Sequence, residues 1–147
     1  MNAISNDGQR GTAEPLSRDP LAPRGRVSIQ VDMTILRQLD MTDLRNLRDA
    51  VRTTSDVMAG LCCQPRFSDD NNNYTHAGRI VENILEFLNA YEQAAVNVAR
   101  AATPVERREV EARHWTILGF EAVMGDDLAD FAVHAAEAVR DEANVKP

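Results

Sequence analysis

Two acid–histidine pairs are the residues whose types and spacing could hold a metal ion. Glu111 precedes His114 by three positions, and Asp130 precedes His134 by four. Carboxylate-bridged di-iron sites in helical bundles use a Glu-x-x-His motif on each of two helices and a glutamate on each of the other two. The four residues are therefore candidate ligands of a metal-dependent enzyme or a metal store, although only one copy of the motif is present.

The directions in which the two histidines point argue against that metal site. On a helix over 104–124, His114 lies roughly opposite the main apolar arc, whose members are Val105, Ala112, Trp115, Gly119, Ala122 and Val123. His134 lies about 120° from the centre of the apolar arc of the following helix. We expect both imidazoles to face solvent, whereas a bundle site needs ligands that point inward.

Three arginines form a second candidate site, one that would bind an anion or a nucleotide. Arg45, Arg48 and Arg52 fall within about 60° on one side of a helix, which would make a positively charged ridge. The competing interpretation is a solvated helix flank, in which Asp49 and Asp56 pair with arginines four positions earlier. A formal net charge of −7 favours the solvated flank.

The rest of the sequence contains no recognisable catalytic motif. No serine lies in a nucleophile elbow, and the seven glycines are scattered singly rather than gathered in a phosphate-binding loop. Basic residues interleaved with aromatics, the pattern typical of nucleic-acid binding, are missing as well. The net negative charge also opposes binding to nucleic acid or to an anionic membrane. We therefore predict no cofactor and favour a non-catalytic protein over an enzyme.

Composition indicates a cytoplasmic bacterial protein. The N-terminal residues contain no apolar core of a secretory signal, and no apolar run approaches the roughly 18 residues of a membrane helix. The two cysteines, Cys62 and Cys63, are adjacent and cannot link distant segments, which suits a reducing compartment. Lys146 is the only lysine, and this arginine bias together with many alanines indicates a GC-rich genome.

The chain is predicted to hold one helical domain, residues 26–147, after a disordered tail, residues 1–25. The tail is rich in Gly, Pro, Ser, Asp and Arg and has no apolar period. Val27, Ile29 and Val31 then alternate with polar residues, which predicts a short extended arm. The arm would either lie on the helices or pair with its counterpart in another subunit.

Local start and stop signals predict an all-α fold. The repeat Asp-Met-Thr at 32–34 and 40–42 reads as two helix starts, because one continuous helix would place carboxylates in its apolar face. The first copy starts a short turn, and the second starts a helix over about 43–60. A strongly amphipathic helix follows over about 75–102. Thr103 with Pro104 starts a helix over 104–124, and Asp126 or Asp127 starts another that runs to about 143. These elements predict an antiparallel bundle of three long helices plus a fourth.

A second apolar line on the segment 104–124 suggests self-association. Val110, Ile117 and Met124 recur every seven residues away from the Trp115 side, and Glu121 flanks them. Two apolar lines mean that the helix is either central in its own bundle or shared with another subunit. We predict a cytosolic interaction or regulatory protein, a homodimer that uses these four residues as its interface, with any other protein partner unspecified.

Overall fold

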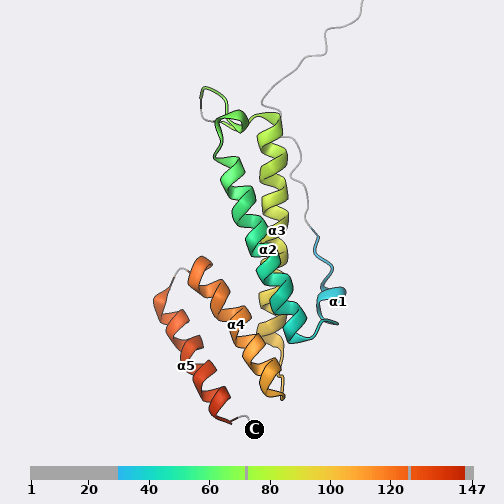
Figure 1. Cartoon of the computed structure of the whole chain (residues 1–147), viewed down its shortest axis with the longest axis vertical. Coiled ribbons are helices and arrows are strands. Elements are labelled where there is room, and N and C mark those ends of the chain that lie inside the picture. The colour runs from blue at the N-terminus through green and yellow to red at the C-terminus, as the bar shows by residue number, and fades with distance from the viewer. Residues whose placement is uncertain (1–29, 72, 126, 145–147) are drawn as a thin grey trace, which may run out of the picture.

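The computed structural model describes residues 30–71, 73–125 and 127–144, and these form an all-α bundle, as predicted (Figure 1). The helices are α1 (Met33–Leu36), α2 (Met41–Cys62), α3 (His76–Ala101), α4 (Arg107–Met124) and α5 (Leu128–Asn144), with a 3-10 turn, η1 (Pro65–Phe67), between α2 and α3. The predicted tail and most of the predicted arm lie outside the described residues. Within the described part of the chain, every helix is too short or too polar to cross a bilayer.

The repeated Asp-Met-Thr signal starts two separate helices, which confirms the prediction that it marks two helix starts. The Asp32 carboxylate accepts a hydrogen bond from the backbone N–H of Thr34 at 2.9 Å and begins α1. The Asp40 carboxylate accepts from the N–H of Asp43 at 2.7 Å and begins α2. Each aspartate satisfies an N–H group that the first helical turn leaves without a partner.

Two other helices begin at side-chain caps, whereas the predicted start of α4 was wrong. Thr75 caps α3 and Asp127 caps α5, by accepting from the N–H groups of Gly78 and Ala129. Helix α4 begins at Arg107 and not at Pro104, with Glu106 as its first flanking residue. Residues 103–105 are used instead to connect the end of α3 to the start of α4, so that they are not free to join the helix.

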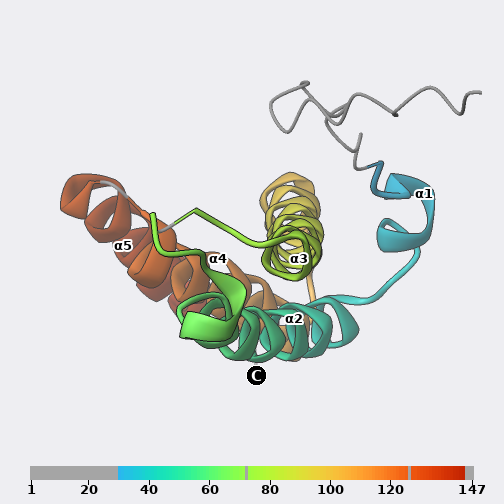
Figure 2. The same ribbon diagram turned by 90° about the horizontal axis from the view of Figure 1, so that it is seen from above.

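The helices form one central pair with additions on both sides. Helices α2 and α3 run antiparallel, and α4 packs across both of them near the C-terminal end of α3 (Figure 1). Helix α5 packs on the outer side of α4, whereas α1 packs on α3 on the opposite side of the molecule (Figure 2). Helix α4 is therefore surrounded by three helices.

The core lies where α1, α2, α3 and α4 meet. Alanines of α3 contribute Ala94, Ala95 and Ala99, whose small side chains allow the neighbouring helices to come close. The complete buried cluster is Leu36, Met41, Leu44, Ala94, Ala95, Val98, Ala99, Ala112 and Ile117. Beyond it, the α2–α3 pair extends toward η1 without cover from α4 or α5 (Figure 1).

Candidate functional site

Arg48, the middle arginine of the predicted ridge, is buried, so its assignment to a solvated flank was wrong. Its Nε lies 3.1 Å from Oε1 of Glu92 on α3, and its Nη2 donates a hydrogen bond to the backbone carbonyl of Gly119 on α4 at 2.6 Å. Only 7% of Arg48 and 1% of Glu92 is exposed. One guanidinium therefore joins three helices, and its charge is neutralised inside the bundle.

The two outer arginines of the ridge are also paired with carboxylates. Arg45 lies 4.0 Å from Asp49 and stacks its guanidinium over the ring of Trp115. Arg52 lies 2.7 Å from Asp56, so both predicted i,i+4 pairs are present. Because all three arginines face a carboxylate, the ridge has little spare positive charge with which to bind an anion or a nucleotide.

A second arginine and a hydroxyl lie near the buried Glu92. Arg52 Nη1 lies 3.8 Å from Glu92 Oε2, and the buried hydroxyl of Ser55 lies one helical turn further along α2. Ser55 makes no hydrogen bond within the described residues. Arg48, Glu92 and Ser55 are buried and Arg52 is partly exposed. Burying an ion pair in this way can fix how helices pack more than it adds to stability. We therefore assign this polar cluster a structural role.

His114 is buried, which corrects the prediction that it faces solvent. It is 5% exposed, and its Nε2 lies 3.1 Å from Oδ2 of Asp141 on α5. Arg113 Nη1 lies 3.8 Å from the same oxygen. The reason is that α5 packs against the side of α4 that carries His114, and Val110 and Ile117 of the second apolar line lie on this same side.

The four predicted metal ligands do not come together. His134 lies 3.8 Å from Glu121, which in turn pairs with Arg100 of α3. Glu111 and Asp130 are exposed, and among the described residues neither forms an ion pair or a hydrogen bond with either imidazole. Among residues 30–71, 73–125 and 127–144, no three or more His, Cys, Asp and Glu side chains converge in a way that could hold a metal ion. The arrangement offers imidazole–carboxylate pairs that attach α5 to α4.

Most of the predicted interface is covered by the chain itself. Val110 and Ile117 are 5% and 3% exposed, and the side chain of Glu121 is 8% exposed. Of the predicted set only Met124 reaches the surface, with 44% exposed. The second apolar line therefore reflects a central position between three helices, which was one of the two interpretations. Trp115, expected in the core, is 54% exposed at the edge of the α2–α4 contact.

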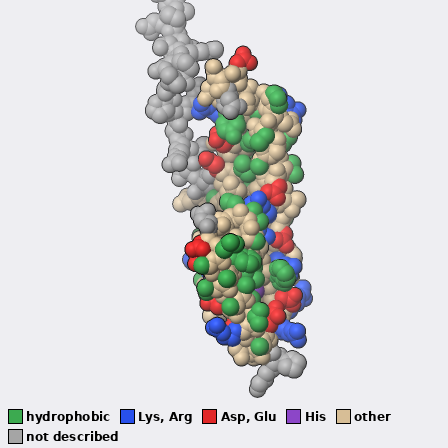
Figure 3. All heavy atoms as spheres, turned by 90° about the vertical axis from the view of Figure 1, so that its left-hand side faces the viewer, with side chains coloured by type: hydrophobic (Ala, Val, Ile, Leu, Met, Phe, Trp, Pro, Cys, Tyr) green, Lys and Arg blue, Asp and Glu red, His purple; other side chains and the backbone are tan. Residues whose placement is uncertain are grey.

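An exposed apolar surface does exist, but it lies on α5. Leu128, Val133 and Val139 are 87%, 56% and 71% exposed, and the only fully buried residue of α5 is Ala138. We call this surface the α5 apolar face, which comprises Leu128, Ala129, Ala132, Val133, Ala136, Val139 and Ala143, all exposed. Figure 3 shows hydrophobic side chains gathered over this part of the molecule. Sequence reasoning missed it, although alanines and valines recur around nearly the whole helix and could have indicated two apolar sides.

A cleft of about 420 Å³ opens between the α3–α4 connection and the end of α5. Its apolar wall comes from residues 102–105 and Val110, and its polar end from Arg113, Asp141 and Asn144. Arg113 is already engaged there, because its Nε donates to the carbonyl of Ala99 at 3.0 Å and its Nη1 faces Asp141. Among the described residues that line the cleft, none is a serine, cysteine or histidine that could act as a nucleophile or a general base.

Comparison with known proteins gives no family for this chain. No family model matches it, and neither a curated protein nor a solved structure is significantly similar to it. Any function must therefore be argued from the residues and contacts described above.

Proposed function

We propose that this chain is a non-catalytic interaction protein that forms a homodimer through the α5 apolar face. The observation that carries the proposal is the exposure of Leu128, Val133 and Val139 on a helix that packs against α4 with its other side. A helix at the surface of a monomer needs only one apolar side. A second one, left in water, is typical of a surface that another protein covers.

The gain from covering this face is of the size that reversible association needs. Burying a leucine or valine side chain contributes about 1.5–3 kcal/mol. A homodimer would bury Leu128, Val133 and Val139 from both copies. The free energy gained from these six side chains is comparable with the roughly 4–15 kcal/mol that association costs in lost freedom of motion. We therefore expect a dimer that forms and dissociates with protein concentration.

The α5 apolar face fits a second copy of itself. Alanines at 129, 132, 136 and 143 let two helices approach closely, and a two-fold symmetric contact brings the same surface together from both copies. If the helices pair antiparallel about Ala136, Arg140 of each copy comes opposite Ala132 of the other α5, two positions from Asp130. Both charged side chains are exposed, and neither belongs to an ion pair among the described residues.

Sedimentation velocity over a range of protein concentrations tests the proposal. The wild-type chain should shift toward twice its mass of 16.3 kDa as concentration rises. Val139→Asp should remain monomeric, because each copy would bury an unpaired carboxylate in the contact. Val57→Asp is the matched control, since Val57 on α2 is also exposed, at 60%, but lies outside the face. A wild-type chain that stays monomeric, or equal dimerisation of Val139→Asp and wild type, would contradict the proposal.

A further inference from the structure

One side of α3 carries a line of apolar residues that are exposed in its N-terminal half and buried in its C-terminal half. Ile80, Ile84, Phe87 and Tyr91 follow one another at the spacing of one helix side, and we call them the α3 strip. Ile80, Ile84 and Phe87 are 62%, 43% and 44% exposed. The rings of Phe87 and Tyr91 pack together with centroids 4.8 Å apart. The strip is thus a continuous apolar surface that faces water.

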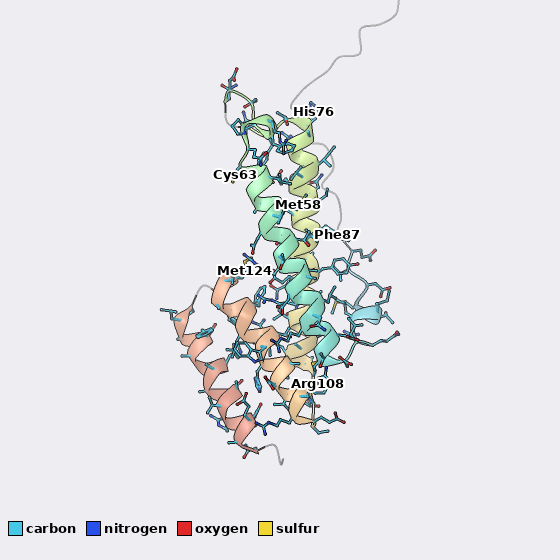
Figure 4. The ribbon with its side chains drawn as sticks, in the orientation of Figure 1. Met58, Cys63, His76, Phe87, Arg108 and Met124 are labelled. Carbon is cyan, nitrogen blue, oxygen red and sulfur yellow. The ribbon has the colours of Figure 1, made fainter. Side chains whose placement is uncertain are left out.

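The same side of α3 is covered further along by the segment that leads into α1. Ala95 and Val98 continue the line of the α3 strip and are buried. Val31 and Met33 pack against the core cluster to which these two residues belong, and α1 contacts α3. Figure 4 shows Phe87 on the side of α3 where α1 lies. This segment therefore packs at the C-terminal half of the line, whereas the residues of the N-terminal half are exposed within the described part of the chain.

The residues just before the described chain have the pattern needed to cover the bare half. Gln30 is exposed and Val31 is partly buried, so the odd-numbered positions point toward the bundle where the described chain begins. Val27 and Ile29 have the same parity, with Ser28 between them. The described chain starts beside the middle of α3 and runs toward the C-terminal end of that helix (Figure 1). The α3 strip therefore lies beyond the point at which the described chain begins, on the side away from α1.

The length of an extended segment before Val31 also fits the length of the α3 strip. An extended chain advances about 3.3 Å per residue, so in an extended arm Ile29 and Val27 would stand about 7 and 13 Å before Val31. A helix rises about 1.5 Å per residue, so Ile80 and Phe87 are about 10 Å apart along α3. In an extended arm Val27 and Ile29 would be about 7 Å apart, so both would fit within the roughly 10 Å between Ile80 and Phe87.

We propose that residues 27–29 lie extended along the α3 strip of the same chain, with Val27 and Ile29 covering Ile84 and Phe87. The α3 strip and the α5 apolar face lie on different helices, so this inference does not depend on the proposed homodimer. It selects the first of the two arrangements that the alternating pattern allows, an arm that lies on the helices of its own chain.

Cleavage by trypsin after Arg26 tests the proposal, because a docked arm is cut only when it detaches. Ile29→Ala and Ile84→Ala should each raise the cleavage rate about 10-fold, the effect expected from losing most of one isoleucine contact. Ser28→Ala and Asn83→Ala are matched controls, since each lies next to a tested position but on another side, and should leave the rate unchanged. Circular dichroism should show that all four variants keep the wild-type helix content.

Three outcomes would overturn the proposal. The first is equal cleavage rates for the tested variants and their controls. The second is wild-type cleavage after Arg26 as fast as in a free peptide of residues 18–34. The third is protection that rises with protein concentration, which would assign the arm to a second copy instead of its own chain.

Discussion

Arg48 and Glu92 form an ion pair that is almost completely enclosed between α2 and α3. Their closest atoms, Nε and Oε1, are 3.1 Å apart, and their side chains are 8% and 1% exposed. Arg48 also holds the backbone carbonyl of Gly119, so the same side chain sets the position of α4. The pair lies beside the main core and connects the helices that form it.

Removal of one partner of this pair should strongly destabilise the fold. Glu92→Gln leaves the Arg48 guanidinium buried without a counter-charge, and we expect a loss of about 3–5 kcal/mol in the free energy of unfolding. Urea denaturation followed by circular dichroism measures it. Arg45→Met is the control, because an exposed pair contributes only about 0–1 kcal/mol. The double variant Arg48→Met/Glu92→Met should recover much of the loss, and equal losses for Glu92→Gln and Arg45→Met would contradict this interpretation.

Replacing either of two helical glycines, Gly60 or Gly78, by alanine should change the free energy of unfolding in opposite directions. A methyl group on Gly78 would overlap the backbone carbonyl oxygen of Phe67, whereas one on Gly60 would meet no atom within 4 Å. Gly60→Ala should therefore raise the free energy of unfolding by about 0.5–1 kcal/mol, the usual gain for alanine in a helix. Gly78→Ala should lower it, because η1 must move away from α3. Urea denaturation of both variants provides the comparison, and a gain at both positions would show that η1 is not held against α3.

Charge reversal tests the antiparallel pairing proposed for α5. Arg140→Asp would place two carboxylates near each other at both ends of the symmetric contact, and Asp130→Arg would do the same with two cations. Each single variant should dimerise more weakly than wild type, and the double variant Arg140→Asp/Asp130→Arg should restore dimerisation. Sedimentation velocity at low salt measures all four proteins. If the double variant is as weak as the singles while Val139→Asp still abolishes dimerisation, the α5 apolar face remains the interface but the antiparallel pairing is wrong.

The two adjacent cysteines should differ in reactivity. Burial raises the pKa of the Cys62 thiol, and the nearby Cys63 and Glu82 add to this effect. Cys63 is exposed, so iodoacetamide at neutral pH should modify it well before Cys62, because only the thiolate reacts. Mass spectrometry after timed quenching distinguishes the two sites, and Cys63→Ser should retain only the slow reaction. The raised pKa of Cys62 also means that its contribution to stability is present at neutral pH and is lost as the pH rises through that pKa.

The sequence by itself determined where most helices begin and end. Asp32, Asp40, Thr75 and Asp127 each cap a helix through a hydrogen bond to a backbone N–H within three residues, so the signal and its effect lie in the same short segment. Gly125 likewise ends α4 where it was expected to. The all-α class followed from these local signals and from the apolar period of α3.

Only the tertiary structure decided which side of each helix is covered. Helix α4 has apolar residues around most of its circumference, and its burial was set by three neighbours, so Val110 and Ile117 became core while Trp115 was left at the surface. Arg48 was buried because Glu92, 44 positions later, reaches it from α3. A side chain's neighbours in sequence fix its position on a helix, but its contacts depend on how distant helices pack. That is why the interface predicted on α4 lies inside the bundle and the exposed apolar face lies on α5.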